Sequence, residues 1–374
     1  MQGTPIRVGI IGISPDPARS WATRAHVPAL RHLPDFELRA VCAQNPETAQ
    51  ATADHFGVPL AFSDPAQMAA HPDVDLVVVA VKAPLHFEII GKVLPAGKAV
   101  FCEWPLGVTT REAQDILEAT ERAGVVNLIG LQGRCSEALN YVRDLIDEGF
   151  VGRVTAVTLH VQQEAFGPVE APDYAHMADV RNGATLLTIG AGHALSAMCH
   201  SVGAFRELSA IVANKHVTVR IAGSETHVPK TAPDQILISG VLQSGAVASV
   251  HLKGGATRTA GNRLEINGTE GDLLLCSTGG ANLQRANFTF TGGRGGVLDD
   301  MPVPERYALQ PPGLPPGDAV AVAHLYDHYA RQRAAGERPS NDFRYAVGQH
   351  ELLDAIQRAS DTGHRQFLEQ RADT

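Results

Sequence analysis

The sequence has few of the features that mark membrane and nucleic-acid-binding proteins. Its longest apolar run, residues 74–81 interrupted only by Asp75, is far shorter than the ~20 residues that a membrane-spanning helix needs. Lys and Arg total 31 against 40 Asp and Glu, which gives a net charge of −9, and no basic block stands out. We therefore expect no membrane and no nucleic acid among the partners.

Cysteine and metal-ligand patterns are also sparse. No C-x-x-C pair occurs, and an odd number of widely spaced cysteines favours reduced thiols in the core: Cys42, Cys102, Cys135, Cys199 and Cys276. The 16 histidines form no H-E-x-x-H or similar spacing, so we predict no metal site. The N-terminus enters a strand-like run without the charged and apolar regions of a secretory leader, which favours a cytoplasmic location.

What is present is typical of a globular protein of about two domains. The 374 residues are 44% apolar and 19% charged, enough to bury a full core. Between residues 6 and 131, short β-branched runs alternate with helical patterns, which is typical of a parallel sheet covered by helices on both faces. The expected strands are 6–12, 36–43, 74–81, 99–103 and 125–131, and Thr109 with Glu112 predicts a capped helix.

After a helix at about 137–148, the pattern changes to longer, alternating strands at 153–161, 207–219, 235–242, 246–252, 263–268 and 272–276. Short turn-like links favour antiparallel hairpins, and one helix is expected at about 183–202. Residues 291–318 are rich in Gly and Pro and predict a surface excursion. Helices at about 318–333 and 343–358 close this second, α+β domain.

A glycine turn follows the first strand. Gly12-Ile13-Ser14 precedes a helix beginning near Trp21, and such a turn can bring backbone N–H groups to a pyrophosphate. Ser14 stands where G-x-G-x-x-G has its second glycine, and the third is absent. Taken alone, the turn fits an ordinary strand-turn-helix connection better than a nucleotide site.

The end of the second strand bears on the choice of cofactor. It reads Ala43-Gln44-Asn45, without the Asp or Glu that usually holds the ribose of NAD, and Glu47 falls in the next helix. Nothing there repels a 2′-phosphate, and Gln44 or Asn45 can hydrogen-bond one. We expect a slight preference for NADP(H).

Two further strand ends carry polar side chains, at Val81-Lys82 and at Glu103-Trp104. Open parallel sheets bind ligands outside the carboxyl ends of their strands. A lysine there is expected to be partly desolvated and able to act on a substrate oxygen, although turning out to water is an equal alternative. Glu103 is either a buried acceptor for a ribose or a loop carboxylate.

Several strings in matching order resemble the Gfo/Idh/MocA oxidoreductases. They are the glycine turn, residues 21–30, Glu103-Trp104-Pro105-Leu106, residues 131–134, Gly190-Ala-Gly-His193, residues 228–234, 252–255 and 267–272. The resemblance covers nearly the whole chain. It is closest to the branch that contains the fungal galactose-regulon inhibitor and its bacterial relatives.

The resemblance implies an α/β protein: an N-terminal Rossmann domain, residues 1–131, that binds NAD(P), and a C-terminal α+β domain, residues 132–374. The second domain would carry a large open, mostly antiparallel sheet with substrate and subunit contacts, and its helices at about 318–358 would pack back towards the first domain. The implied assembly is a homodimer or homotetramer. The implied reaction is hydride exchange with a small sugar-, glycoside- or cyclitol-like carbinol or ketone.

The chain departs from the family pattern at two positions. Trp104 replaces the lysine of the family's E-K-P string, and Thr188 stands near the position of a family aspartate that precedes His193. Because neighbouring parallel strands lie about 5 Å apart, we hypothesise that Lys82 supplies the missing ammonium one strand over. His193 would then be the general acid/base.

The remaining site residues are expected as follows. The substrate would meet Tyr174, Thr188 and Lys230. Arg134 and Lys230 would clamp substrate or cofactor, or form a domain-interface ion pair. Cofactor-binding residues would be Gly12, Ile13, Ser14, Trp21, Ala43, Gln44, Asn45, Val81, Lys82, His86, Glu103, Trp104, Gln132 and Arg134.

Two other functions remain open at this point. One is a non-catalytic, NAD(P)-dependent regulatory or binding protein, which has no need of a cation beside the nicotinamide. The other is redox-assisted glycoside cleavage, in which the cofactor is reduced and reoxidised within one turnover. The NAD(P)-dependent oxidoreductase is the leading interpretation.

Overall fold

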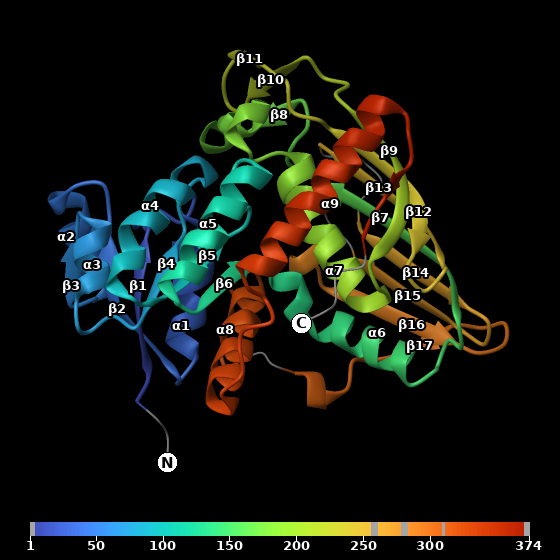
Figure 1. Ribbon diagram of the computed structural model, residues 1–374, viewed down its shortest axis with the longest axis horizontal. Helices are drawn as coiled ribbons and strands as arrows, with labels where there is room; N and C mark the ends of the chain where they lie inside the picture. The colour runs from blue at the N-terminus through green and yellow to red at the C-terminus, as the bar shows by residue number, and fades with distance from the viewer. Residues whose placement is uncertain (1–3, 256–260, 278–282, 309–310, 370–374) are drawn as a thin grey trace. The chain divides into compact units, whose positions relative to one another are not determined.

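Two units make up the fold (Figure 1). The computed structural model describes residues 4–255, 261–277, 283–308 and 311–369. Unit 1 comprises Met1–Leu131 and Leu309–Gly348, and unit 2 comprises Gln132–Ala308 and Gln349–Thr374. The second domain is therefore not the continuous stretch 132–374 that we expected, because residues 309–348 belong to unit 1.

Unit 1 contains a parallel sheet of six strands in the order β3-β2-β1-β4-β5-β6. The strands are β1 (Ile6–Ile11), β2 (Phe36–Cys42), β3 (Leu60–Phe62), β4 (Leu76–Val79), β5 (Ala99–Glu103) and β6 (Asn127–Gly130). β3, with only three residues, was not predicted. β4 is shorter than predicted, and the Asp75 carboxylate just before it binds the Arg7 guanidinium at 2.9 Å.

Helices accompany this sheet, and their bounds follow local capping signals. The Thr109 side chain accepts a hydrogen bond from the Glu112 N–H at 3.1 Å and begins α5, while the Glu112 carboxylate accepts from Val108 at 2.9 Å. Ala113 and Ile116 lie on its buried face. The elements are η1 (Ala22–His26), α1 (Val27–His32), α2 (Pro46–Phe56), α3 (Pro65–Ala70), η2 (Ala83–Leu85), α4 (His86–Val93), η3 (Leu94–Ala96), α5 (Thr110–Ala123) and α8 (Asp318–Ala335).

Unit 2 contains a nine-stranded sheet in the order β17-β16-β15-β14-β7-β13-β12-β9-β18, in which β7 and β13 are parallel and the other pairs are antiparallel. The strands are β7 (Val154–Gln163), β9 (Phe205–Ala213), β12 (Gln235–Leu242), β13 (Val247–Gly254), β14 (Arg263–Gly268), β15 (Asp272–Ser277), β16 (Phe288–Gly293), β17 (Asp299–Asp300) and β18 (Gln366–Phe367). A small second sheet joins β8 (Val169–Glu170), β10 (Thr218–Ile221) and β11 (His227–Pro229).

Two predicted segments of unit 2 differ from the structure. The single strand expected at 207–219 is broken into β9 and β10, because the buried Asp234 carboxylate accepts the N–H groups of Lys215 and His216 and turns the chain there. The Gly/Pro-rich excursion begins later than expected, since its first residues complete β16.

Helices lie along one face of the large sheet, as Figure 1 shows for α6 and α7. The expected helix at 183–202 begins with a π-helical segment. On the opposite face Ile211, Leu237 and Val247 are 59%, 41% and 60% exposed. The unit-2 elements are η4 (Gln132–Cys135), α6 (Glu137–Asp147), η5 (Pro172–Ala178), η6 (Val180–Asn182), η7 (Leu186–Ala191), α7 (Gly192–Val202), η8 (Leu283–Arg285) and η9 (Glu305–Tyr307), and α9 (Phe343–Thr362) begins in unit 1.

Two sequence-level expectations concern the whole chain. Among the described residues, no helix has both the length and the apolar character needed to cross a membrane. All five cysteines are unpaired thiols: Cys42, Cys102 and Cys135 are buried, and Cys199 and Cys276 are half-buried.

Candidate functional site

The strand order of unit 1 places β1 between β2 and β4, where the direction of chain connection reverses. Ligands of open parallel sheets bind at such a switch point, outside the carboxyl ends of the strands. Gly12 follows β1 with a φ of 89°, and a Cβ atom there would lie 2.7 Å from the Ala80 carbonyl oxygen. Only glycine fits this close approach, and its open backbone is the cradle that a pyrophosphate requires.

The rest of the first turn is held by local contacts. Ile13 is buried, and the Ser14 hydroxyl accepts the Asp16 N–H at 3.2 Å. Trp21, half-buried, begins the π-helical segment η1, with the Arg24 guanidinium 5.5 Å from the centre of its ring. A turn of this length and shape fits a dinucleotide, with Ser14 in place of the second glycine.

The end of β2 carries no acid, as predicted. Ala43 is half-buried, and Asn45 caps α2 by accepting the Thr48 N–H at 2.8 Å, so the Asn45 side-chain oxygen is already engaged. Glu47 lies in the first turn of α2. Gln44 is exposed and has no hydrogen-bond partner in the described part of the chain, which leaves it the better candidate for a contact with a ribose or its phosphate.

Lys82 and His86 follow the end of β4 and differ in burial. Lys82 is exposed, which agrees with the alternative of a side chain turned out to water and not with a partly desolvated ammonium. His86 is 1% exposed, with Nδ1 2.9 Å from the Pro105 carbonyl and Nε2 3.0 Å from the Val81 carbonyl. Burial lowers its pKa. His86 therefore joins the loops that follow β4 and β5.

Glu103 ends β5 and has a partner that sequence reasoning missed. Its carboxylate Oε1 lies 2.8 Å from Nε2 of His26, which is fully buried. His26 stands in the helical string Ala25-His26-Val27-Pro28, where an ionisable residue on an apolar face requires a buried partner. A histidine within this apolar string was the sequence signal that could have predicted a buried partner for His26. Trp104, next along the chain, is 5% exposed and lies in the interior.

The predicted substrate residues belong to unit 2, where their surroundings are largely local. The Thr188 hydroxyl accepts the Thr185 N–H at 2.8 Å in a capping box at the start of η7, so its first role is structural. His193 lies in α7 and is 6% exposed. Tyr174 is half-buried in η5, while in η4 Gln132 is buried and Arg134 is half-buried.

Lys230 lies in the interior of unit 2. Its side chain is buried beside Asp234, with Nζ 3.4 Å from the carboxylate, and it also donates to the Ala232 carbonyl. Desolvation lowers the pKa of this lysine. The ammonium therefore has acceptors within unit 2.

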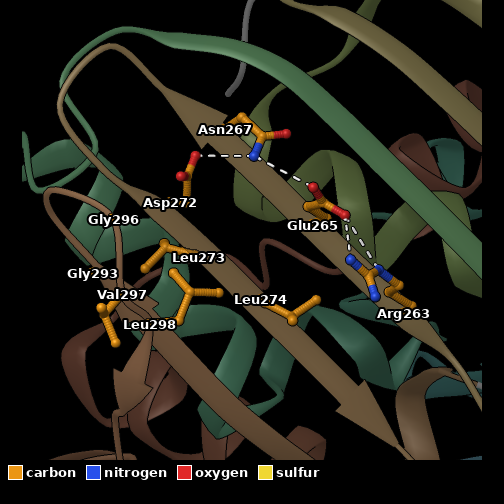
Figure 2. A pocket seen from close by; sticks show the side chains of 10 residues that line it. All are labelled: Arg263, Glu265, Asn267, Asp272, Leu273, Leu274, Gly293, Gly296, Val297 and Leu298. Carbon is orange, nitrogen blue, oxygen red and sulfur yellow. Dashed lines mark hydrogen bonds and ion pairs between the residues drawn. The ribbon is translucent and has the colours of Figure 1, made fainter.

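A cavity in unit 2 is lined by none of these residues. Figure 2 shows this pocket of about 180 Å³, beside β14, β15 and the loop after β16. Its polar side chains pair with one another, Arg263 with Glu265 at 2.7 Å and Asn267 with Asp272 at 2.9 Å. In the described residues, no group of three metal-ligating side chains lies together.

Comparison with known proteins agrees with this geometry. Residues 6–131 match the family described as "Oxidoreductase family, NAD-binding Rossmann fold", and residues 138–277 match "Gal80p, C-terminal domain". The galactose/lactose metabolism regulatory protein GAL80 of Saccharomyces cerevisiae is 29% identical, with 87% of this chain and 79% of that protein covered. Levoglucosan dehydrogenase of Pseudarthrobacter phenanthrenivorans is 27% identical, covering 72% of this chain and 73% of the enzyme.

The solved structures show the same fold. A super-repressor mutant of Gal80p from Saccharomyces cerevisiae superposes with a TM-score of 0.86 at 22% identity, covering 97% of this chain and 98% of that one. The two family matches agree with the strand order of the parallel sheet. The chain belongs to the Gfo/Idh/MocA oxidoreductase family and carries a Gal80-like C-terminal domain.

Proposed function

We propose that the protein is an NAD(P)-dependent oxidoreductase that acts on a small sugar-, glycoside- or cyclitol-like carbinol or ketone. The observation that carries this proposal is the Gly12 turn, where the backbone passes too close to Ala80 for any side chain, at the switch point of the parallel sheet. The similarity to levoglucosan dehydrogenase supports the substrate class.

The residues that would hold the cofactor lie after the strands of unit 1. Backbone N–H groups from Gly12 to Ser14 would meet the pyrophosphate, and Gln44 would face the adenosine ribose. Because no carboxylate stands at the end of β2 to repel a 2′-phosphate, we retain a slight preference for NADP(H).

The proton chemistry would be carried by Lys82 and His193. When bound, NAD(P)⁺ accepts the hydride from the substrate carbon, and the hydroxyl proton passes to one of these two side chains. Lys82 is exposed, whereas His193 is buried. They belong to different units of the chain.

The experiment that tests this function begins with fluorescence titration of NADH and NADPH, followed by a screen of sugars, cyclitols and their keto forms for nicotinamide absorbance change. We expect binding and turnover with at least one class. Lys82→Met should lower turnover by orders of magnitude with little change in cofactor affinity. Lys92→Met is the matched control, since Lys92 is an exposed lysine on α4 that pairs only with Glu88 among the described acidic side chains. Turnover by Lys82→Met equal to that of the control removes Lys82 from the mechanism.

A second function is favoured by a specific observation. Trp104, buried, stands where the family has its E-K-P lysine, and the chain is 29% identical to the regulatory protein GAL80 over most of its length. A non-catalytic, NAD(P)-dependent regulatory protein fits these two facts. Tight cofactor binding with no turnover across the whole panel would select this function.

We also propose self-association through unit 2, as a homodimer or homotetramer. The sheet face opposite α6 and α7 exposes aliphatic side chains on adjacent strands, with Leu237 directly across from Ile211. Contiguous exposed apolar surface of this kind marks an association site. Size-exclusion chromatography with light scattering measures the oligomer.

A further inference from the structure

Three polar side chains form a chain of hydrogen bonds inside unit 1, behind the end of β5. His26 Nε2 lies 2.8 Å from Glu103 Oε1, and His26 Nδ1 lies 2.8 Å from the Tyr326 hydroxyl. The three residues come from η1, β5 and α8. His26 and Tyr326 are 0% and 1% exposed, and Glu103 is 8% exposed. The polar chain therefore runs from the interior to the edge of the sheet where ligands of this fold bind.

The surroundings of this chain are aromatic. The centre of the Phe101 ring lies 5.2 Å from that of His26 and 5.4 Å from that of Tyr326. The ring centres of Phe36 and Tyr326 lie 5.0 Å apart. Hydrogen bonds in such weakly polar surroundings are stronger than in water, and an unmade one is costly. The arrangement is consequently rigid.

The chemistry of the three groups sets the direction of both hydrogen bonds. A carboxylate can only accept, so Nε2–H of His26 donates to Glu103. In the tautomer with its proton on Nε2, the imidazole has a lone pair on Nδ1, which accepts from the Tyr326 hydroxyl. Burial and the nearby Glu103 raise the pKa of Tyr326 well above its usual value, so the phenol keeps the proton that it donates.

The opposite side of the carboxylate is bounded by Gly130, the residue that pairs with Glu103 on β6. A Cβ atom at Gly130 would lie 2.5 Å from Glu103 Oε2 and 2.8 Å from Cδ. The carboxylate is thus held between His26 and the bare backbone of β6. Any side chain at residue 130 would displace it.

We propose that Tyr326 and His26 are positioning residues that hold Glu103 as the hydrogen-bond acceptor for a ribose hydroxyl of the nicotinamide half of NAD(P). The proposal rests on the proposed cofactor binding and assigns new roles to His26, Tyr326 and Gly130. The assignment to the nicotinamide half follows from position, since β4 to β6 form the second mononucleotide-binding half of this fold. Because the side chain is preorganised, its acceptor geometry costs no ordering entropy when the cofactor binds.

The first test removes one hydroxyl. Tyr326→Phe keeps the ring and its packing, and should raise the dissociation constant for NADH by about 3- to 10-fold, the effect of one net hydrogen bond. Tyr329→Phe is the matched control, because Tyr329 lies on the same helix, is 5% exposed and also packs on Phe36, but it does not contact His26 in the described structure. The control should bind NADH like the wild type.

The second test displaces the Glu103 carboxylate from the side of β6. Gly130→Ala should weaken NADH binding by more than 10-fold in the wild-type background and have little effect in a Glu103→Ala background, where no carboxylate remains to be displaced. This non-additivity separates positioning of Glu103 from general damage to β6. Thermal unfolding of each variant verifies that it is folded.

The third readout does not involve the cofactor. Nitrogen-15 spectra of labelled histidine, with His26 assigned through His26→Gln, should show the Nε2–H tautomer at neutral pH. A wild type that binds NADH while Tyr326→Phe and Gly130→Ala bind within twofold of it overturns this inference and leaves the proposed function standing. An Nδ1–H tautomer of His26 also overturns it. A wild type that binds neither NADH nor NADPH overturns the inference and the proposed cofactor binding together.

Discussion

Replacing Asp234 by Asn tests the buried charge pair that turns the chain between β9 and β10. Asp234 is 0% exposed, and the Lys230 side chain beside it is 2% exposed. The carboxylate accepts three hydrogen bonds at 3.0 to 3.1 Å from the N–H groups of Lys215 and His216. Asp234→Asn removes its charge, leaves the Lys230 ammonium buried, and keeps only one acceptor oxygen for those donors.

The expected loss is about 3 kcal/mol of unfolding free energy, the lower end of the ~3–5 kcal/mol typical of breaking a buried pair, because Lys230 retains the Ala232 carbonyl. With a urea slope of about 2 kcal/mol per molar, the midpoint should fall by about 1.5 M. The loss of unfolding free energy caused by Asp234→Asn should become smaller as pH rises. Burial lowers the folded-state pKa of Lys230 below its usual 10.5, so the unfolded chain binds more protons and stability increases with pH up to that value.

The assay uses the distribution of tryptophan. Trp21 and Trp104 both lie in unit 1, so tryptophan fluorescence follows unit 1 and far-ultraviolet circular dichroism follows both units. The dichroism transition should move while the fluorescence transition moves less. Lys230→Met combined with Asp234→Asn should recover more than half of the loss, since no charge is left buried. A loss below about 1 kcal/mol that does not change with pH would show that the pair is solvated.

Three further outcomes are expected. Gly12→Ala should abolish measurable NADH binding in fluorescence titration and lower the unfolding free energy by about 1–3 kcal/mol. Gly97→Ala is the control, because Gly97 has a φ of 66° and no atom lies within 4 Å of its added Cβ. This control should leave NADH binding unchanged. Burial raises the pKa of Glu170 to about 7, so stability should fall by up to about 3 kcal/mol as pH rises from about 4.5 to 7, and urea titrations of Glu170→Gln should lack this slope. Leu237→Glu should dissociate the oligomer in light scattering, while Val217→Glu, 78% exposed but outside the large sheet, should not.

The exposure of Lys82 changes how the catalytic hypothesis must be judged. The side chain of Lys82 lies in solvent, so burial does not point to a catalytic role for it. Its side chain has no described hydrogen bond or ion pair that restrains it. The decision between enzyme and regulatory protein therefore depends on the turnover measurement and on the Lys82→Met variant.

Local sequence signals predicted much of unit 1. Continuous apolar runs predicted its buried strands, because a strand covered on both faces has no polar side to alternate with. Thr109 predicted the start of α5, since a capping side chain acts within one turn of its own residue. Gly12 predicted the turn after β1 for the same local reason, namely a backbone conformation that other residues rarely adopt.

The sequence by itself thus determined the parallel sheet, the helix caps, the glycine turn and the absence of an acid after β2, all of which depend on residues close together in the chain. Only the tertiary structure decided the partners of Glu103. His26 is 77 residues away from it, and Tyr326 is 300 residues away from His26. Asp234 breaks a predicted strand from 18 and 19 residues beyond it. Long-range pairing of this kind depends on which buried polar groups must satisfy one another once the core forms, and no local pattern contains that information.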